Sequence, residues 1–355
     1  MNNLWKLLKN IRLPFSLSMQ IVFDLGTTTT RIALKDKGII LKEPTCIGYN
    51  TKTQEAIFYG RDAKNVIGKT PEFIKINRPI IAGIISDFDA EVDMIKYYLD
   101  KSVSPYLHQS KIIKPKLHAI VSYPVIATEI EQKAAEEVLL KAGCSSVFMI
   151  PRPLATGAGC KLNIFSHQPH AIVSLGGGLI EISIISGGGI VGSKTLKNAG
   201  ESMDKIIANY AYLKHGIILG EATCEKLKIS LLNFKGEEKI ILVRGKSLET
   251  GLPKSIKMNA GEIIEALHGN FNQIVESIKE LIEISPPEIV DDIYEEGIFF
   301  TGELSNIPGV DDFFNKELKI NINLPENFAD ATIHGLRILG SKSENIEKLK
   351  SYRFF

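Results

Sequence analysis

The alternation of apolar and polar positions predicts a chain in which strands and helices are intermixed. Residues 21–34 alternate as two strands around a turn, and residues 118–124 form a short apolar run that ends at Pro124, as a buried strand does. Thr128 and Glu131 have the spacing of a capping box, which predicts a helix start. Further helices are predicted over residues 90–112, 200–214, 221–231, 260–283 and about 330–340. The helix at about 330–340 is predicted to be the final one. This mixture indicates the α/β class.

Two stretches about half a chain apart share one plan of strand, glycine turn and strand. The first is IVFDLGTTTTRIAL at residues 21–34, in which Asp24 ends an apolar strand just before Gly26. The second is AIVSLGGGLIEISIIS at residues 171–186, where Ser174 stands at the place of the aspartate. This long-range echo predicts a duplicated fold with a cleft between its halves.

Glycine-rich turns of this kind leave backbone N–H groups free to point at an anion, because glycine tolerates positive φ and lets the backbone approach closely. Two such turns that face each other would grip a polyphosphate from both sides. A carboxylate just before the turn, here Asp24, would hold Mg²⁺ through water, since magnesium releases its waters reluctantly. The pair of turns therefore indicates a nucleotide site with Asp24 as the magnesium residue.

Composition and charge exclude several classes of protein. The chain has 355 residues, 44% of them hydrophobic and 23% charged, and its formal net charge of +1 does not point to nucleic acid. The four cysteines stand far apart without a CxxC pair, and the seven histidines show no paired spacing, which argues against a zinc site and fits a reduced cytoplasm. No apolar run reaches the ~18 residues of a spanning helix.

The N-terminal stretch MNNLWKLLKNIRLPF, residues 1–15, has the pattern of a basic amphipathic helix. Its apolar positions are Leu4, Trp5, Leu7, Leu8 and Ile11. Lys6, Lys9 and Arg12 fall mostly on the other side, and Pro14 stops the pattern. Such a segment either lies in a membrane interface or packs on its own domain, and the periodicity alone leaves both readings open.

Several motifs in succession resemble MreB, the bacterial actin. They begin with Asp24–Leu34, followed by KGIILKEPTCIG, and continue with GRDAKNVIGKTPEFIKINRPIIAGIISDFD at residues 60–89. The later segments KAGCSSVFMIPRPLATGAG, SLGGGLIEISIIS, NAGESMDKII, LGEATCEKLKI and GIFFTGELSNIPGVDDFF stand in the MreB order. The resemblance covers roughly residues 19–340, and it is specific because the order and the spacings of the motifs agree.

The resemblance implies the two-lobed fold shared by actin and the heat-shock chaperone ATPases, in which two similar α/β lobes close on ATP and magnesium. It predicts a first lobe from residues 19–160 together with 331–355, with a smaller part at about 49–86. The second lobe is predicted over residues 161–330, with a smaller part at about 198–262.

The resemblance also implies a function. MreB proteins form double filaments on the inner membrane face and guide cell-wall synthesis in rod-shaped cells. The expected partners are therefore further copies of the chain, the cytoplasmic membrane surface, and other MreB-type subunits or cell-wall machinery, without nucleic acid. Because several MreBs bind membrane through such a helix, the resemblance favours the membrane reading of residues 1–15 and a peripheral position at the inner face of the cell membrane.

Position by position, the resemblance assigns nucleotide-binding residues. The first phosphate turn corresponds to Asp24, Gly26, Thr27 and Thr28, and the second to Gly176, Gly177 and Gly178. The adenosine contacts correspond to Glu225 and Lys228, and the adenine loop begins at Gly302. Within this set, Asp24 is also the expected metal residue.

The sequence departs from the MreB pattern at four places, all of them at the nucleotide. Ser174 replaces an aspartate, Leu179 replaces a threonine, and Arg152 replaces the glutamate that helps position the attacking water. Glu303 and Leu304 stand where the adenine loop has glycines. Because the loss of one charge-stabilising group typically costs ~10²–10³ in rate, these changes predict a degenerate ATPase. Such a protein binds ATP, hydrolyses it poorly or not at all, and keeps none of the family's catalytic residues.

Alternative readings stay open on the sequence alone. Arg152 either lies near the γ-phosphate or is a solvated surface residue, and Glu181 either replaces the lost acid or links the lobes structurally. At the level of function, a membrane-associated filament competes with a non-filamentous actin-fold membrane adaptor whose nucleotide site is vestigial. A sugar-kinase-like phosphotransferase shares the two turns, but it would need a catalytic aspartate for the acceptor hydroxyl, and none can be identified.

Overall fold

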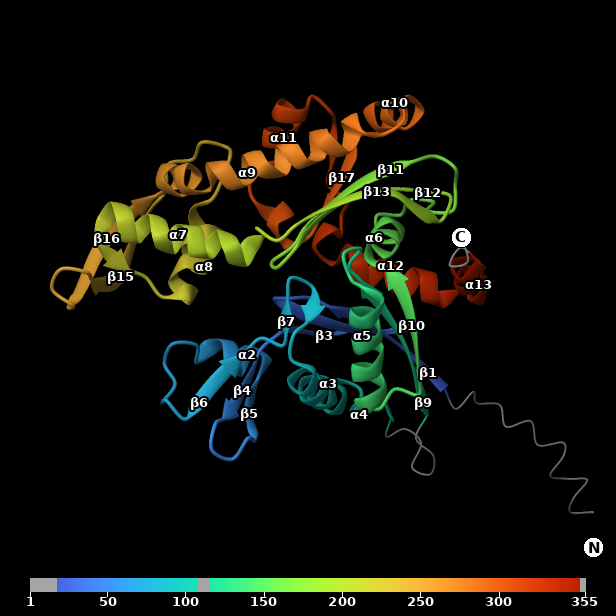
Figure 1. Ribbon diagram of the computed structural model, residues 1–355, viewed down its shortest axis with the longest axis horizontal. Coiled ribbons are helices and arrows are strands. Elements are labelled where there is room, and N and C mark those ends of the chain that lie inside the picture. The colour runs from blue at the N-terminus through green and yellow to red at the C-terminus, as the bar shows by residue number, and fades with distance from the viewer. Residues whose placement is uncertain (1–17, 108–114, 352–355) are drawn as a thin grey trace, which may run out of the picture.

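The computed structural model describes residues 18–107 and 115–351 of the chain. Two α/β lobes lie on either side of a central cleft, and each lobe carries a smaller part (Figure 1). The predicted membrane segment, residues 1–15, lies outside the described residues. Within the described ranges, no helix is long and apolar enough to cross a bilayer.

The first lobe is built on a five-stranded sheet in the order β10-β9-β1-β2-β3. Its strands are β1 (Ser18–Leu25), β2 (Thr29–Leu34), β3 (Gly38–Pro44), β9 (Lys116–Tyr123) and β10 (Ser146–Pro151). Strand β1 pairs antiparallel with β2 and parallel with β9. The helices of this lobe include α3 (Phe88–Ser102), α4 (Ser104–Leu107) and α5 (Glu129–Lys141). Helix α5 begins at the capping box of Thr128 and Glu131, as predicted.

The second lobe repeats this plan, with the strand order β13-β12-β11-β17-β18. Its strands are β11 (His170–Leu175), β12 (Ile180–Ser186), β13 (Gly189–Leu196), β17 (Ile298–Thr301) and β18 (Ile322–Asn323). As in the first lobe, the first strand pairs antiparallel with the next strand and parallel with a later one. The helices of this lobe include α9 (Ala260–Glu283), α10 (Pro287–Glu296) and α11 (Val310–Leu318). The two sheets therefore have the predicted duplication.

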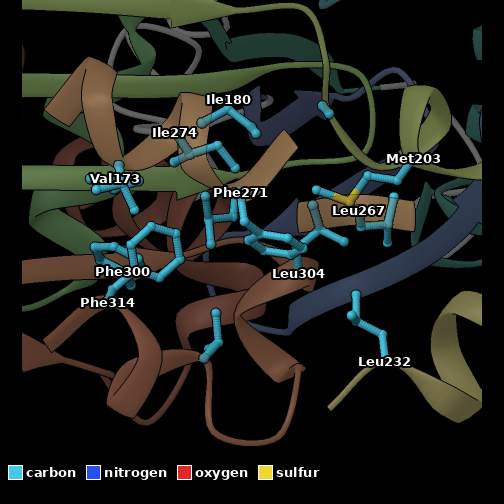
Figure 2. Close-up of a cluster of buried hydrophobic side chains, with 14 of the residues drawn as sticks. Val173, Ile180, Met203, Leu232, Leu267, Phe271, Ile274, Phe300, Leu304 and Phe314 are labelled. Carbon is cyan, nitrogen blue, oxygen red and sulfur yellow. The ribbon is translucent and has the colours of Figure 1, made fainter. Parts of the chain in front are cut away.

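An aromatic core holds the second lobe together (Figure 2). Phe271 of α9, Phe300 of β17 and Phe314 of α11 are each at most 2% exposed. The rings of Phe300 and Phe314 meet edge to face with their centroids 4.8 Å apart. Val173 and Ile180 of the β11–β12 hairpin belong to the same cluster. Because burying one side chain of this size contributes about 1.5–3 kcal/mol, the hairpin that carries the second glycine turn is fixed firmly to its lobe.

Each lobe carries a smaller sheet beyond the main one. The first comprises β4 (Ile47–Asn50), β5 (Ala56–Tyr59) and β6 (Ile74–Asn77), with α2 (Gly60–Asn65) and the hairpin of β7 (Ile80–Ile81) and β8 (Ile84–Ile85) beside it. The second comprises β14 (Ile217–Ile218), β15 (Ile240–Ser247) and β16 (Pro253–Asn259), with α7 (Gly200–His215) and α8 (Glu221–Leu231) beside it. The residue boundaries predicted for the lobes and their smaller parts stay a prediction.

Two short helices, α6 (Arg152–Gly159) and α12 (Ala331–Ser341), pack against each other between the two large sheets (Figure 1). Their backbones approach closely, since a Cβ added to Gly335 would lie 1.6 Å from the carbonyl oxygen of Ala155. Side chains from β1 and β9 of one sheet and from β11 and β12 of the other pack on this helix pair. The pair therefore couples the two lobes at the base of the cleft.

Several elements differ from the prediction. A further helix, α13 (Ser343–Ser351), follows α12, so the prediction that the final helix covers about 330–340 is wrong. The helix predicted within 90–112 ends at Ser102, and the short α4 follows it. Helix α10 and strand β16 carried no prediction. The fold class is the predicted one, an α/β chain with two similar sheets.

Candidate functional site

A cavity of about 790 Å³ lies between the lobes, within the range of about 300–1,000 Å³ that is typical of small-molecule sites. The glycine turns line it with Thr28 and Gly177, and the loop after β17 lines it with Leu304. The two smaller parts supply the remaining walls, for example with Lys228. A smaller cavity of about 80 Å³, here called the floor cavity, adjoins it and shares Thr28, Gly177 and Glu303 in its lining. The site thus has a wide chamber and a narrow floor.

The two glycine turns touch each other at this floor. A Cβ added to Gly177 would lie 2.4 Å from Cγ2 of Thr28, and one added to Gly178 would lie 2.2 Å from Oγ1 of Thr27. Only glycine therefore fits at these two positions. Gly83, in the turn between β7 and β8, donates its N–H to Oγ1 of Thr27 at 2.8 Å. This hydrogen bond fixes the hydroxyl of the first turn.

The structure brings the predicted phosphate residues together. The floor cavity is lined by Asp24, Gly26, Thr27, Thr28, Gly176, Gly177, Gly178 and Gly302, among others. The predicted adenosine residues Glu225 and Lys228, both on α8, lie on the wall of the large cavity instead. Lys228 is buried, and its Nζ pairs with Asp204 at 2.8 Å and donates to the carbonyl oxygen of Gly200 at 2.7 Å. The roles of these residues in binding stay predictions.

The floor cavity also contains a buried arginine that the sequence did not single out. Arg31 is 6% exposed and stands opposite Asp24 in the register of β1 and β2. Its guanidinium contacts three carboxylates, those of Asp24 at 3.4 Å, Glu303 at 2.8 Å and Asp330 at 2.6 Å. Lys42 adds a second cation, 2.9 Å from both Glu303 and Asp330. The first hairpin is therefore linked ionically to the loops after β17 and β18.

The ion pairs of this network shift the pKa values of Arg31 and Asp330. Burial alone would lower the pKa of Arg31, but the charges of Asp24, Asp330 and Glu303 outweigh burial and raise that pKa. Burial would likewise raise the pKa of Asp330, and the contacts from Lys42 and Arg31 lower it instead. Arg31 and Asp330 are both charged at neutral pH as a result.

A second arginine–carboxylate pair lies on the other side of the floor cavity. Arg152, at the start of α6, donates from Nη1 to Oε2 of Glu181 at 3.0 Å, and the N–H of Val125 donates to Oε1 at 2.9 Å. Arg152 is 9% exposed, so its interpretation as a solvated surface residue is wrong. Glu181 lies on β12 of one sheet while its partners follow β9 and β10 of the other, which confirms its cross-lobe role. Ser174 and Leu179 line the same cavity.

Ion pairs also join the two smaller parts across the large cavity. Nζ of Lys64 on α2 is 2.8 Å from Oε1 of Glu225 on α8. Arg78, after β6, contacts Glu221 on α8 and Glu201 on α7, the latter at 3.3 Å. Partly exposed pairs of this kind contribute no more than about 1 kcal/mol each. Together they favour a cleft whose two sides are drawn toward each other.

The loop after β17 supplies the remaining wall. Gly302 has φ +92°, and a Cβ there would lie 2.4 Å from the carbonyl oxygen of Leu175, so the turn requires glycine. Glu303 and Leu304, which stand where the adenine loop has glycines, both line the large cavity. Glu303 turns toward Arg31, whereas Leu304 is buried in the core of the second lobe.

A model of the MreB/Mbl protein family matches residues 18–349. This chain belongs to the MreB/Mbl family. The cell shape-determining protein Mbl of Bacillus cereus is 33% identical to it over 332 residues, which cover 93% of this chain and 97% of that protein. The cell shape-determining protein MreB of Escherichia coli is 32% identical over 329 residues, 90% of this chain and 92% of that protein. Among solved structures, MreB5 of Spiroplasma citri bound to ADP matches with a TM-score of 0.87 at 28% identity, over 93% of this chain and 98% of that one.

Membership of the MreB/Mbl family confirms the resemblance drawn from the motif order, and the match to MreB5 confirms the actin-like fold. Arg31 and Arg78 are among the cleft residues of this MreB/Mbl chain that the sequence did not single out. The spacing of the first hairpin could have found Arg31, because a tight turn after residue 25 places position 31 opposite position 24. No signal in the sequence brings Arg78 to the acids of α7 and α8, since that contact depends on how the two smaller parts meet.

Proposed function

We propose that this chain is a cytoskeletal protein of the MreB/Mbl type, which forms actin-like filaments at the cell membrane, helps determine cell shape and organises cell-wall synthesis. The proposal rests on the structure of the cleft, where two facing glycine turns on two similar sheets adjoin a cavity of nucleoside size. Relatives that match over nearly their whole length are named cell shape-determining proteins. Through residues 1–15, the proposal includes a peripheral position at the inner face of the membrane.

Self-association is proposed to use the smaller parts, near residues 49–86 and 198–262. On the second of these, Ile240, Leu242 and Leu252 are 63%, 67% and 65% exposed. Ile240 and Leu242 stand two residues apart on β15 and therefore share one face of that strand. Exposed apolar side chains that share a face are typical of interaction sites. If such a surface meets a different surface of the next copy, the contact builds an open filament and not a closed ring.

We expect the purified protein to form filaments that are visible by negative-stain electron microscopy on a monolayer containing anionic lipid. Leu242→Lys should abolish or shorten these filaments, because it places a charge in the apolar contact. Leu242→Met keeps the apolar surface and should assemble like the unmodified chain. A chain that lacks residues 1–15 should form filaments in solution but fail to bind the lipid, because the apolar face of that segment supplies the burial in the membrane.

Two outcomes contradict parts of this proposal. A strictly monomeric protein over a wide concentration range, with and without ATP and lipid, favours a non-filamentous actin-fold membrane adaptor. Full lipid binding by the truncated chain removes residues 1–15 as the anchor and leaves the filament untouched.

We also propose that the cleft binds ATP and hydrolyses it poorly. MreB5 of Spiroplasma citri was crystallised with ADP and with AMPPNP, which supports a nucleotide in the cleft of this relative. The position that would carry the water-orienting glutamate holds Arg152, and its ion pair with Glu181 keeps the carboxylate of Glu181 occupied. Ser174 is uncharged. The residues that would activate a water are therefore absent or engaged.

The side chains of the floor cavity argue against the magnesium ion that was predicted at Asp24. In nucleotide sites, Mg²⁺ keeps several of its waters and is held by one or two carboxylates together with the phosphates. Arg31 contacts Asp24, Arg152 contacts Glu181, and Ser174 carries no charge. The residues present do not fit a divalent cation, so no step is assigned to one.

Phosphate release from ATP should be about 10²–10³-fold slower than that of an MreB with glutamate and aspartate at positions 152 and 174, because charge-stabilising groups are lost. The exchange Arg152→Glu with Glu181→Arg returns a carboxylate to position 152 and keeps an oppositely charged partner. Combined with Ser174→Asp, it should recover part of the rate in a malachite-green phosphate assay. Turnover of the unmodified protein at the rate of the comparison MreB would refute impaired hydrolysis.

A further inference from the structure

The two glycine-turn hairpins carry matching pairs of polar positions at the floor of the cleft. Asp24 and Arg31 stand opposite each other in the register of β1 and β2. Ser174 and Glu181 stand opposite each other in the register of β11 and β12. The carboxylate is thus on the first strand of one hairpin and on the second strand of the other. Each carboxylate has its own guanidinium, Arg31 in one case and Arg152 in the other.

Arg31 is directed at the chain itself. It donates from Nε to Asp330, from Nη1 to Asp24, and from Nη2 to Glu303 and to the carbonyl oxygen of Ala329. These hydrogen bonds use four of the roughly five N–H groups of the guanidinium, one on Nε, one on Nη1 and two on Nη2. The side chain is 7% exposed, so this cation is built into the hairpin and does not reach in from the surface.

The other side of the floor cavity is equally engaged. Glu181 is 4% exposed at its side chain, and both of its oxygens accept hydrogen bonds, one from Arg152 and one from Val125. Ser174 offers only a neutral hydroxyl. A divalent cation at this floor would have to separate a buried ion pair and stand close to a guanidinium that repels it. The carboxylates on the two hairpins are thus both paired with cations of the chain itself.

We propose that the cleft binds its nucleotide without a divalent cation, because Arg31 and Arg152 already pair with Asp24 and Glu181, the carboxylates that would hold one. The inference rests on the nucleotide binding proposed above and concerns only whether a metal ion accompanies the nucleotide. Backbone N–H groups of the two glycine turns donate to the phosphates, as such turns do for anions generally. Arg31 and Arg152 line the cavity between those turns and keep Asp24 and Glu181 engaged.

Isothermal titration calorimetry of the full chain with ADP and with ATP, once in magnesium chloride and once in EDTA, tests this proposal. For the unmodified protein, the dissociation constants for ADP in the two buffers should agree within about threefold, because no metal takes part in the complex. Arg31→Leu removes the cation and frees Asp24, so its affinity should be at least about tenfold weaker in EDTA than in magnesium. Arg31→Lys keeps a positive charge and should bind without metal.

Lys161→Met is the matched control, because it removes a cation from an exposed pair with Glu326, outside both cavities. Its two dissociation constants should agree like those of the unmodified chain. An unmodified protein that binds at least about tenfold more weakly in EDTA overturns the inference and leaves nucleotide binding standing. Absence of binding in both buffers overturns nucleotide binding and this inference with it. If melting curves show that Arg31→Leu does not fold, the unmodified chain in the two buffers still decides.

Discussion

Replacing Arg152 with methionine should lower the free energy of unfolding by about 3–5 kcal/mol, because it leaves a buried carboxylate without its charged partner. The side chains of Arg152 and Glu181 are 11% and 4% exposed, and 3.0 Å separates Nη1 from Oε2. Little water reaches a pair this deeply buried to replace the lost guanidinium. Urea denaturation, followed by circular dichroism, measures the change.

The double variant Arg152→Met with Glu181→Met separates the pair from its surroundings. When both charges are removed together, no orphaned charge remains, and apolar replacements of buried ion pairs are often neutral or stabilising. The double variant should therefore be much more stable than Arg152→Met alone. Lys161→Met, which breaks an exposed pair with Glu326, should cost less than about 1 kcal/mol. A loss for Arg152→Met as small as that of Lys161→Met would show that the floor pair does not hold the lobes together.

Local structure could be predicted wherever a short pattern decides the outcome. The helix predicted over residues 260–283 coincides with α9, because Asn259 and Glu262 form a capping box at its start. The two glycine-turn hairpins were predicted for a similar reason, since apolar strands and glycines at fixed spacing allow few alternatives. Helix α13 was missed because its sequence, SENIEKLKS, is strongly polar and buries only Leu349.

The contacts of the site depend on packing between segments that are far apart in the chain. Arg31 meets Glu303 and Asp330, which lie 272 and 299 residues further on. The hairpin register supplies Asp24 as a neighbour, but only the meeting of the two lobes supplies the other two carboxylates. A strand residue can be assigned to a face from the sequence, whereas its partners from another lobe cannot.

The same limit explains why the partner of Arg152 was not predicted. From the sequence, an arginine at the place of a glutamate is a lost carboxylate, with either a phosphate or solvent as its neighbour. In the structure its neighbour is Glu181, with which it forms a buried ion pair. The register of β11 and β12 points to Ser174 as the partner of Glu181 and gives no sign of α6. The carboxylates and guanidinium groups at the floor of the cleft are therefore paired with one another.

Glu91→Gln should stabilise the protein above acidic pH. Glu91 lies on α3 at 0% exposure, and neither of its carboxyl oxygens has a hydrogen-bond partner within the described part of the chain. Burial raises the pKa of Glu91 to about 8 from its ordinary value of 4.5. The folded protein therefore keeps this carboxyl neutral at pH 7, while the unfolded chain ionises it freely. Ionisation in the unfolded chain lowers the free energy of unfolding at neutral pH.

The sign and the pH window follow from these two pKa values. Below the unfolded pKa, both states are neutral at this position, so Glu91→Gln should match the unmodified chain. As pH rises toward the folded pKa of about 8, the unmodified protein loses about 1.4 kcal/mol per pH unit relative to the variant. The difference should reach about 3 kcal/mol at pH 7 and level off above the folded pKa. Urea midpoints of both proteins measured from pH 4 to pH 9 give this curve, and other titrating groups cancel because both chains carry them. Parallel stability curves over the whole range would show that Glu91 has an ordinary pKa, and hence that solvent reaches its carboxyl.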